Sequence, residues 1–187
     1  MEAASFALFD TALGRCAIAW RGDAVIGFAL PGISEEATSA QLIRRHPGAV
    51  VAEPSEVIAR AIIAVRRLLA GERTDLSFIK VDLAGAAAFE GAVYEALRSV
   101  GPGDTVTYGV LAERAGSPGA ARAVGMAMGR NPIPVIIPCH RVLAGGGKSG
   151  GFSAPGGVNT KFRLLQIEQA GRGDTLLFED LPLSVKG

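Results

Sequence analysis

Apolar and polar residues alternate in two short runs near the start of the chain. RCAIAW (15–20) and AVIGFAL (24–30) are rich in residues that favour strands, and the RGD tripeptide between them has the composition of a tight turn. We therefore expect a hairpin here. An adhesion motif is the other interpretation of RGD, but a turn is favoured because no export signal precedes it. LSFIKVDL (76–83) predicts a further strand.

Two segments between these strands have the apolar spacing of helices. They are EEATSAQLIRRH (35–46) and PSEVIARAIIAVRRLLAG (54–71), and the second is opened by Pro54 and closed by Gly71. The first half is thus expected to be a small α/β unit. The alanine-rich stretch 84–88 predicts its boundary with the second half.

The second half begins with a helical pattern in FEGAVYEALRSV (89–100). A short helix is expected at 108–115, followed by a GSPG turn and a third helix from about residue 119 to 129. Two short helices joined by a glycine-containing turn are typical of a helix-turn-helix. Such pairs also occur in proteins that never contact DNA.

The third helix is expected to carry glycine on its outer face. Arg122, Gly125, Met126 and Gly129 lie opposite its apolar stripe. Each glycine inside a helix costs about 1 kcal/mol relative to alanine, so this face is expected to need close approach of another molecule or element. A DNA groove satisfies that need, and so does close packing against another helix.

The segment NPIPVIIPCHR (131–141) contains three prolines, which exclude a helix and predict a stiff extended arm ending at Cys139. LAGGGKSGGF (143–152) predicts a mobile glycine loop or hairpin tip. A last helix is expected within 154–171, with Asn159 or Thr160 near its start and Gly171 after its end.

Composition narrows the class of protein. The 187 residues are 49% hydrophobic and 20% charged, as in ordinary globular proteins, with no apolar run long enough to span a membrane. MEAASFALFD does not resemble a signal peptide, so a cytoplasmic location is expected. Only two cysteines and two histidines occur, without C-x-x-C or H-x-x-x-H spacing, so neither a disulfide framework nor a metal site is expected.

The net charge of +1 is distributed unevenly along the chain. Residues 1–86 carry nine basic and ten acidic side chains, whereas residues 98–163 carry eight basic and two acidic ones, a local charge of +6. A local basic field is what a polyanion such as DNA requires. A solvated basic face is the alternative interpretation.

Cys139 and His140 are adjacent in PCHR, and a thiol needs a base before it can act as a nucleophile. His140 is one candidate base and His46 is the other. Glu168 follows two leucines at helical spacing, so its carboxylate is a candidate to orient the imidazole. The alternative is that Glu168 is solvated at a frayed helix end. Cys16 is expected to be a core residue of a strand.

Five ordered segments of the chain, within about residues 89–168, resemble the methylated-DNA–protein-cysteine methyltransferases, also called O6-alkylguanine-DNA alkyltransferases. PCHRV after NPIPVIIP resembles the active-site signature, and AARAVGMAMGRNPIP resembles the recognition helix with its asparagine hinge. FEGAVYEALRSVGPGDTVTYGVLAERAG and GGVNTKFRLLQIE resemble the flanking segments. The first half is only loosely similar.

The resemblance implies an α+β fold with two domains. Residues 1–86 would form a small α/β domain that is ribonuclease-H-like. Residues 87–187 would form a winged helix-turn-helix-like domain that binds DNA and accepts the alkyl group. It also implies a monomer that needs no cofactor, no membrane and no obligate protein partner, and that acts on double-stranded DNA containing O6-alkylguanine.

The resemblance further implies roles for individual residues. Cys139 would accept the alkyl group once per molecule, His140 would deprotonate it through a water, and Glu168 would orient His140. Asn131 would be the hinge, and Tyr108 would help rotate the base and protonate the leaving guanine. The expected DNA-binding residues are Arg122, Tyr108, Ala121, Gly125 and Arg130. The expected lining of the guanine pocket is Met128, Val142, Ser153 and Lys161.

The chain departs from the family pattern at GFSAPGG, where Ala154 and Pro155 separate Ser153 from the glycine pair. That loop borders the substrate pocket in the family, so the departure bears on which alkyl group is accepted. Two other functions are compatible with parts of the pattern. One is a non-catalytic protein that binds alkyl lesions, and the other is a winged-helix DNA-binding regulator in which PCHR is structural.

Overall fold

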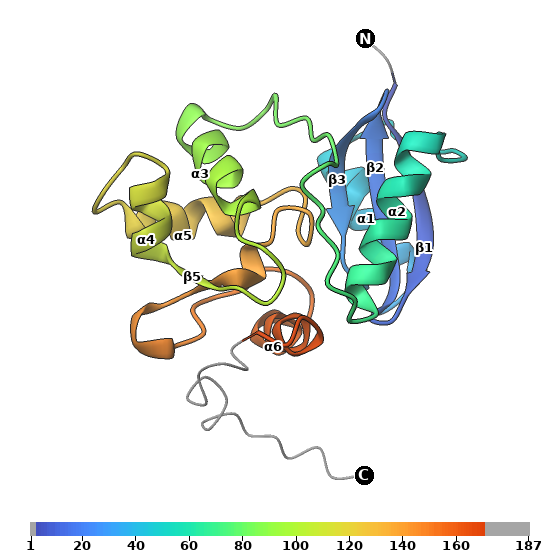
Figure 1. The fold of residues 1–187 in the computed structure, drawn as a ribbon. Helices are drawn as coiled ribbons and strands as arrows, with labels where there is room; N and C mark the ends of the chain where they lie inside the picture. The colour runs from blue at the N-terminus through green and yellow to red at the C-terminus, as the bar shows by residue number, and fades with distance from the viewer. Residues whose placement is uncertain (1–2, 171–187) are drawn as a thin grey trace, which may run out of the picture.

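The computed structural model describes residues 3–170 and has a mixed α+β fold (Figure 1). A sheet with two helices forms one side, and the remaining helices form the other. The elements in chain order are β1 (Ser5–Thr11), β2 (Gly14–Arg21), β3 (Ala24–Ala29), α1 (Glu35–Arg45), β4 (Val50–Val51), α2 (Glu56–Leu69), α3 (Ala88–Arg98), β5 (Val106–Thr107), α4 (Tyr108–Arg114), α5 (Ala121–Arg130), β6 (Val142–Leu143) and α6 (Gly157–Ile167).

The first sheet has the strand order β3-β2-β1-β4, with β2 antiparallel to both neighbours and β4 parallel to β1. Helices α1 and α2 cover its opposite faces (Figure 1). Ala17 and Ala19 of β2 therefore pack in one core with Leu42 of α1, and Ile18 and Trp20 belong to the core that contains α2. Burial on both faces explains why this strand is apolar at consecutive positions.

The predicted hairpin and the two predicted helices are confirmed. Ser34 and Ser55 are the N-caps of α1 and α2, and their hydroxyl oxygens accept hydrogen bonds from Ala37 N and Ile58 N. Gly71 follows α2 with a φ of +94°, a backbone conformation that glycine adopts without strain. Strands β1 and β4 were not predicted.

The strand predicted at 76–83 is wrong. Only Val81 bridges to Val25 of β3, where Val25 N donates to Lys80 O and Asp82 N donates to Val25 O. Before this point the chain turns, because the carboxylate of Asp75 accepts hydrogen bonds from the backbone N and the hydroxyl of Ser77. This local side-chain bond competes with strand pairing.

Helices α3, α4 and α5 pack together on the other side of the molecule, with α6 below them in Figure 1. Tyr94 of α3 is buried, and its hydroxyl donates to Ala127 O of α5 at 2.8 Å. The two-residue strands β5 and β6 pair in parallel and join the start of α4 to the segment after Cys139. One apolar core continues from α2 through α3, α5 and the Ile133–Ile137 segment.

The stiff extended arm expected at 131–141 is also wrong. The prolines do exclude a helix, but the segment folds into a compact buried turn in which Ile137 N donates to Ile133 O at 2.8 Å. Val135 at its centre has a φ of 74°, which is strained for a β-branched residue. Four buried apolar side chains hold this turn in the core, and they are Ile133, Val135, Ile136 and Ile137.

The glycine-rich segment after β6 makes a tight turn, in which Ala144 N donates to Lys148 O at 2.8 Å and both Gly146 and Gly147 have positive φ. The last predicted helix is present as α6, which begins at Gly157, ahead of Asn159 and Thr160. Gly171 lies outside the described residues. Within 3–170, no helix has the length and apolarity needed to cross a lipid bilayer.

Candidate active site

Cys139 lies at the start of a single turn of 3-10 helix, Cys139–Arg141, directly after the buried proline turn. Its backbone N donates to Ile137 O at 2.8 Å, and only 7% of the residue is exposed. The thiol is therefore held by backbone geometry at the edge of the core. It reaches solvent only through the cavities that it lines.

Asn131 connects this turn to α5, where it is the C-cap. Its Nδ2 donates to Ile137 O at 2.8 Å, and its Oδ1 accepts from Ile133 N at 3.0 Å. The buried side chain thus satisfies a donor and an acceptor of the turn at once. Arg45 of α1 adds a contact from the first half of the chain by donating to Asn131 O at 2.8 Å.

His140, the residue after the cysteine, meets Glu168 at the end of α6. His140 Nε2 lies 2.9 Å from Glu168 Oε1, and both side chains are almost completely buried. An ionised carboxylate can only accept, so Nε2 is the nitrogen that carries the proton. His140 Nδ1 is then the free acceptor, and it has no hydrogen-bond partner within residues 3–170.

Arg141 completes this network. Its Nε donates to Glu168 Oε2 at 2.9 Å, its Nη2 donates to Glu168 Oε1 at 2.7 Å, and its Nη1 donates to Val100 O at 2.5 Å. The residue is 4% exposed. A bidentate pair of this kind fixes the plane of the carboxylate and therefore the orientation of the imidazole.

Burial and charge set the protonation states. Burial raises the pKa of Glu168, but the charges and hydrogen bonds of His140 and Arg141 outweigh it and lower the pKa to about 2. Burial lowers the pKa of His140, so the guanidinium of Arg141 is the permanent positive charge beside Glu168. Burial raises the pKa of the Cys139 thiol, while the Asn131 side chain and the charge of Lys161 act in the opposite direction. The thiol is therefore protonated until a base removes its proton.

Lys161 of α6 is completely buried, and its Nζ donates to Val142 O at 2.5 Å and to Gly151 O at 3.3 Å. Burial lowers the pKa of its ammonium group to about 8. The ammonium also lies 5.9 Å from the centre of the Tyr108 ring. Lys161 therefore joins α6, the loop after β6 and the start of α4 directly behind the cavity wall.

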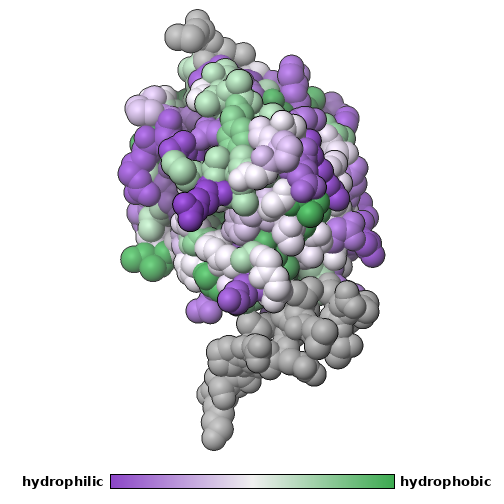
Figure 2. All heavy atoms as spheres, turned by 90° about the vertical axis from the view of Figure 1, so that its left-hand side faces the viewer, coloured by the Kyte–Doolittle hydropathy of each residue, from purple (hydrophilic) through white to green (hydrophobic). Residues whose placement is uncertain are grey.

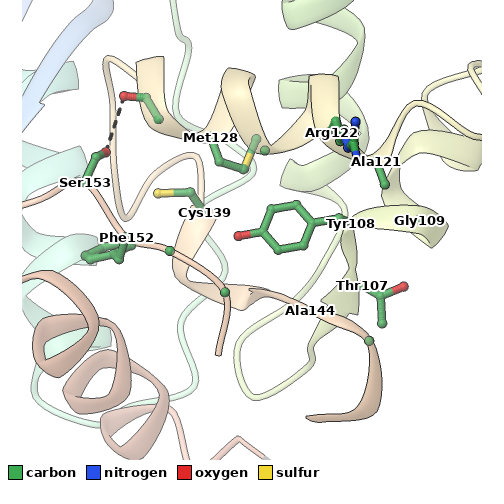
Figure 3. Close-up of a pocket in the computed structure, with 15 residues that line it drawn as sticks. Thr107, Tyr108, Gly109, Ala121, Arg122, Met128, Cys139, Ala144, Phe152 and Ser153 are labelled. Carbon is green, nitrogen blue, oxygen red and sulfur yellow. Dashed lines mark hydrogen bonds between the residues drawn. The ribbon is translucent and has the colours of Figure 1, made fainter. Parts of the chain in front are cut away.

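Cys139 opens into a cavity of about 810 Å³ between α4, α5 and the loop 144–153. Figure 3 shows Tyr108 on one side, with its hydroxyl turned toward the side of Cys139, and Met128, Phe152 and Ser153 around the thiol. Arg122 and Ala121 lie at the opposite end, on the first turn of α5. The cavity has a largely apolar wall and is large enough for a small planar molecule.

Comparison with known proteins identifies the family. Residues 88–170 match the family model described as the 6-O-methylguanine DNA methyltransferase, DNA binding domain. The methylated-DNA–protein-cysteine methyltransferase of Mycobacterium leprae is 42% identical over 125 residues, which are 63% of this chain and 73% of that protein. The chain belongs to the methylated-DNA–protein-cysteine methyltransferase family. These proteins are cysteine S-methyltransferases of DNA repair.

Solved structures agree with this assignment. The crystal structure of Mycobacterium tuberculosis OGT in complex with DNA has a TM-score of 0.73 and 31% identity, covering 88% of this chain and 92% of that one. The O6-methylguanine-DNA methyltransferase of Pyrococcus kodakaraensis has a TM-score of 0.64 and 27% identity, covering 88% and 98%. The similarity therefore includes the first half of the chain, where the sequence resemblance is weak.

The structure brings most of the residues expected from the family resemblance to one place. Six line the cavity of Cys139, and they are Tyr108, Ala121, Arg122, Gly125, Met128 and Ser153. Val142 is fully buried and lies behind the wall with Lys161. Arg130 lies apart from the cavity, because its guanidinium donates to Glu90 at 2.7 Å. The hydroxyl of Ser153 donates to Gly129 O at 3.3 Å.

The alternative base, His46, is not near the thiol. It lies at the end of α1 with its ring against Gly27 of β3, where burial lowers its pKa. Cys16 is completely buried in β2, and burial raises the pKa of its thiol to about 11. Of the two cysteines, Cys139 is therefore the one that lines an open cavity. Of the two histidines, His140 is the one whose ring is bonded to a carboxylate.

Arg141 was missed as a site residue and was counted only as part of the basic stretch. That stretch is less exposed than its sequence indicates, because Arg141 and Lys161 are both buried. Arg122 is exposed and lines the cavity. Figure 2 shows hydrophilic side chains around a paler, hollowed centre on the side of the molecule where α3, α4 and α5 lie. No local sequence signal distinguishes a buried arginine from an exposed one in this segment.

Proposed function

We propose that this chain repairs O6-alkylguanine in double-stranded DNA by transferring the alkyl group irreversibly to Cys139, once per molecule. The observation that carries the proposal is the thiol of Cys139 at an open cavity, followed directly in the chain by His140, whose imidazole is held by the Glu168–Arg141 pair. This is the arrangement that nucleophilic catalysis requires: a nucleophile, a base and a group that orients the base.

His140 acts as the base through a water molecule. Its Nδ1 is a buried acceptor without a partner within residues 3–170, and its Nε2 is held by Glu168. A proton that leaves the thiol is accepted at Nδ1, and the imidazolium that forms is stabilised by the Glu168 carboxylate. Lys161 lies close enough to lower the pKa of Cys139, so its charge favours the thiolate.

The thiolate then attacks the alkyl carbon in a displacement. The bond from carbon to guanine O6 breaks as the bond from sulfur to carbon forms, and the guanine takes up a proton. The hydroxyl of Tyr108 is the donor, since it faces this side of the cavity. The thioether has no leaving group, and the described residues place no second thiol near it, so the protein acts once.

Access requires that the guanine leave the DNA stack, because the alkyl carbon inside a duplex cannot be approached in line by the thiol. Base flipping is less costly for a damaged pair. Residues Ala121, Arg122 and Gly125 present the first turns of α5 at the mouth of the cavity, and we propose that α5 enters the minor groove there. Arg122 fills the space left by the extruded base.

We assign the finer architecture on the same basis. The described part of residues 1–86 forms a ribonuclease-H-like domain, and the described part of residues 87–187 forms a winged helix-turn-helix-like domain in which α4 and α5 are the helix pair. The short connection between α4 and α5 and their mutual packing support this assignment. Asn131 is the hinge that transmits the position of α5 to the cysteine turn.

The test is mass spectrometry of the intact protein and its peptides after mixing with a duplex that contains one O6-methylguanine. We expect a stoichiometric gain of one methylene group on the peptide of Cys139 and no gain in Cys139→Ser. Cys16→Ser is the matched control, because it removes the other cysteine and is expected to transfer normally. Tight binding of the lesion without transfer would instead support the non-catalytic lesion-binding protein, and equal binding of damaged and undamaged duplex without transfer would support a DNA-binding regulator.

A further inference from the structure

A second cavity opens at Cys139 on the side that faces α1. Its volume is about 480 Å³, and it shares four lining residues with the first cavity: Met128, Cys139, Phe152 and Ser153. From there it extends between β3, α1 and Pro155. In Figure 3 the thiol points away from Tyr108 and toward Ser153 and Phe152, which line both cavities. The sulfur therefore lies where the two cavities meet.

The second cavity is positively charged. Three polar side chains of α1 line it, and no aspartate or glutamate is among the described residues of its wall. Gln41 donates to Leu30 O, and Arg45 donates to Asn131 O. Arg44 is exposed and has no hydrogen bond or ion pair within residues 3–170. Its guanidinium is thus a free donor at the wall of a cavity that reaches the nucleophile.

The in-line geometry of the attack by the Cys139 sulfur indicates what this second cavity could hold. The attacked carbon must lie in line between the sulfur of Cys139 and guanine O6, so the rest of the alkyl group projects to the side of that line. If the guanine occupies the first cavity, the second is the space beside the sulfur into which further atoms can extend. Ala154 and Pro155 form part of its wall.

We propose that the second cavity receives the part of an O6 substituent that lies beyond the reacting carbon, and that Arg44 favours substituents ending in a carboxylate. This inference rests on the function proposed above. The chemical step is the same: the sulfur–carbon bond forms, the carbon–O6 bond breaks, and the proton lost from the thiol is balanced by the one that guanine takes up. The carboxylate keeps its charge throughout, and no other reactant is needed.

The experiment measures the rate of transfer to Cys139 from three duplexes that differ only in the O6 substituent: methyl, carboxypropyl and carbamoylpropyl. The two propyl groups have the same shape, and their end groups are far enough from the reacting carbon that the chemistry is equal. An exposed ion pair contributes up to about 1 kcal/mol, so the wild type should react about fivefold faster with the carboxylate than with the amide. Arg44→Gln should lower this ratio to about one.

Arg60→Gln is the matched control, because Arg60 is an exposed arginine of α2 that lines neither cavity. It removes the same charge and should keep the ratio of the wild type. A ratio of about one in the wild type, or a ratio that Arg44→Gln leaves unchanged, would overturn the role of Arg44. Methyl transfer without transfer of either propyl group would overturn the tail site alone. Absence of methyl transfer would overturn the proposed function and this inference together.

Discussion

Two arginines make ion pairs of the same length in very different surroundings. Arg141 Nη2 lies 2.7 Å from Glu168 in the core, and the two side chains are 5% and 2% exposed. Arg130 Nη1 lies 2.7 Å from Glu90, but the Arg130 side chain is 61% exposed. Replacing each arginine by methionine therefore tests what burial contributes while the distance is constant.

Arg141→Met should be strongly destabilising. It leaves the Glu168 carboxylate buried without a permanent countercharge, which costs about 3–5 kcal/mol. It also removes the donor to Val100 O, which adds about 1 kcal/mol. Arg130→Met should cost only about 1 kcal/mol, because the Arg130 side chain is 61% exposed and water screens its charge, although the Glu90 side chain is 14% exposed. The free energy of unfolding of a domain is only about 5–15 kcal/mol, so Arg141→Met should remove much of it.

The free energy of unfolding can be measured by urea titration, with the fluorescence of Trp20 and circular dichroism as independent probes. Adding Glu168→Gln to Arg141→Met should recover part of the loss, since the double variant has no unpaired charge. Equal losses in Arg141→Met and Arg130→Met would refute the reasoning. So would a loss below about 1 kcal/mol in Arg141→Met.

Two further predictions concern the same site. The pKa of Glu168 is about 2 in the folded protein and higher in the unfolded chain, so its contribution of about 3 kcal/mol is present above the ordinary pKa and is lost as pH falls toward 2. The difference in unfolding free energy between the wild type and Glu168→Gln should thus shrink by about half between neutral pH and about pH 3, and a constant difference would contradict the assignment. Gly150→Ala should slow alkyl transfer by at least about tenfold, because its Cβ would lie 2.7 Å from the hydroxyl of Tyr108 at a φ of +65°. Gly151→Ala meets no atom within 4 Å and should transfer at the normal rate, so equal single-turnover rates in the two variants would exclude this role of Tyr108.

Local patterns predicted the longer elements well. Helices α1 and α2 follow from apolar spacing with serine, proline and glycine at their ends, and β2 and β3 follow from a short polar turn between apolar runs. The strands β4, β5 and β6 have two residues each, which is too short to show any periodicity. The strand predicted at 76–83 is absent because an apolar run also occurs where a chain packs beside a sheet without pairing along its length.

The candidate site was predicted only in part. The adjacent Cys139 and His140, and a glutamate on an apolar helix face, indicated the type of chemistry. The proline-rich segment was expected to be extended, because prolines restrict local torsions but do not reveal the turn that buried isoleucines and Asn131 impose. Arg141 had no signal, since its partners are far along the chain.

The sequence by itself determined the secondary structure of the longer segments and the family, and it indicated Cys139 as the candidate nucleophile. These depend on residues within a few positions of one another or on a contiguous motif. Tertiary structure alone decided that His46 lies against Gly27 and outside the walls of the two cavities at Cys139, that Arg141 holds Glu168 across 27 positions, and that α1 brings Arg44 to a second cavity. The physical reason is that such contacts arise from the packing of distant apolar faces, which places charged groups together without leaving a local pattern.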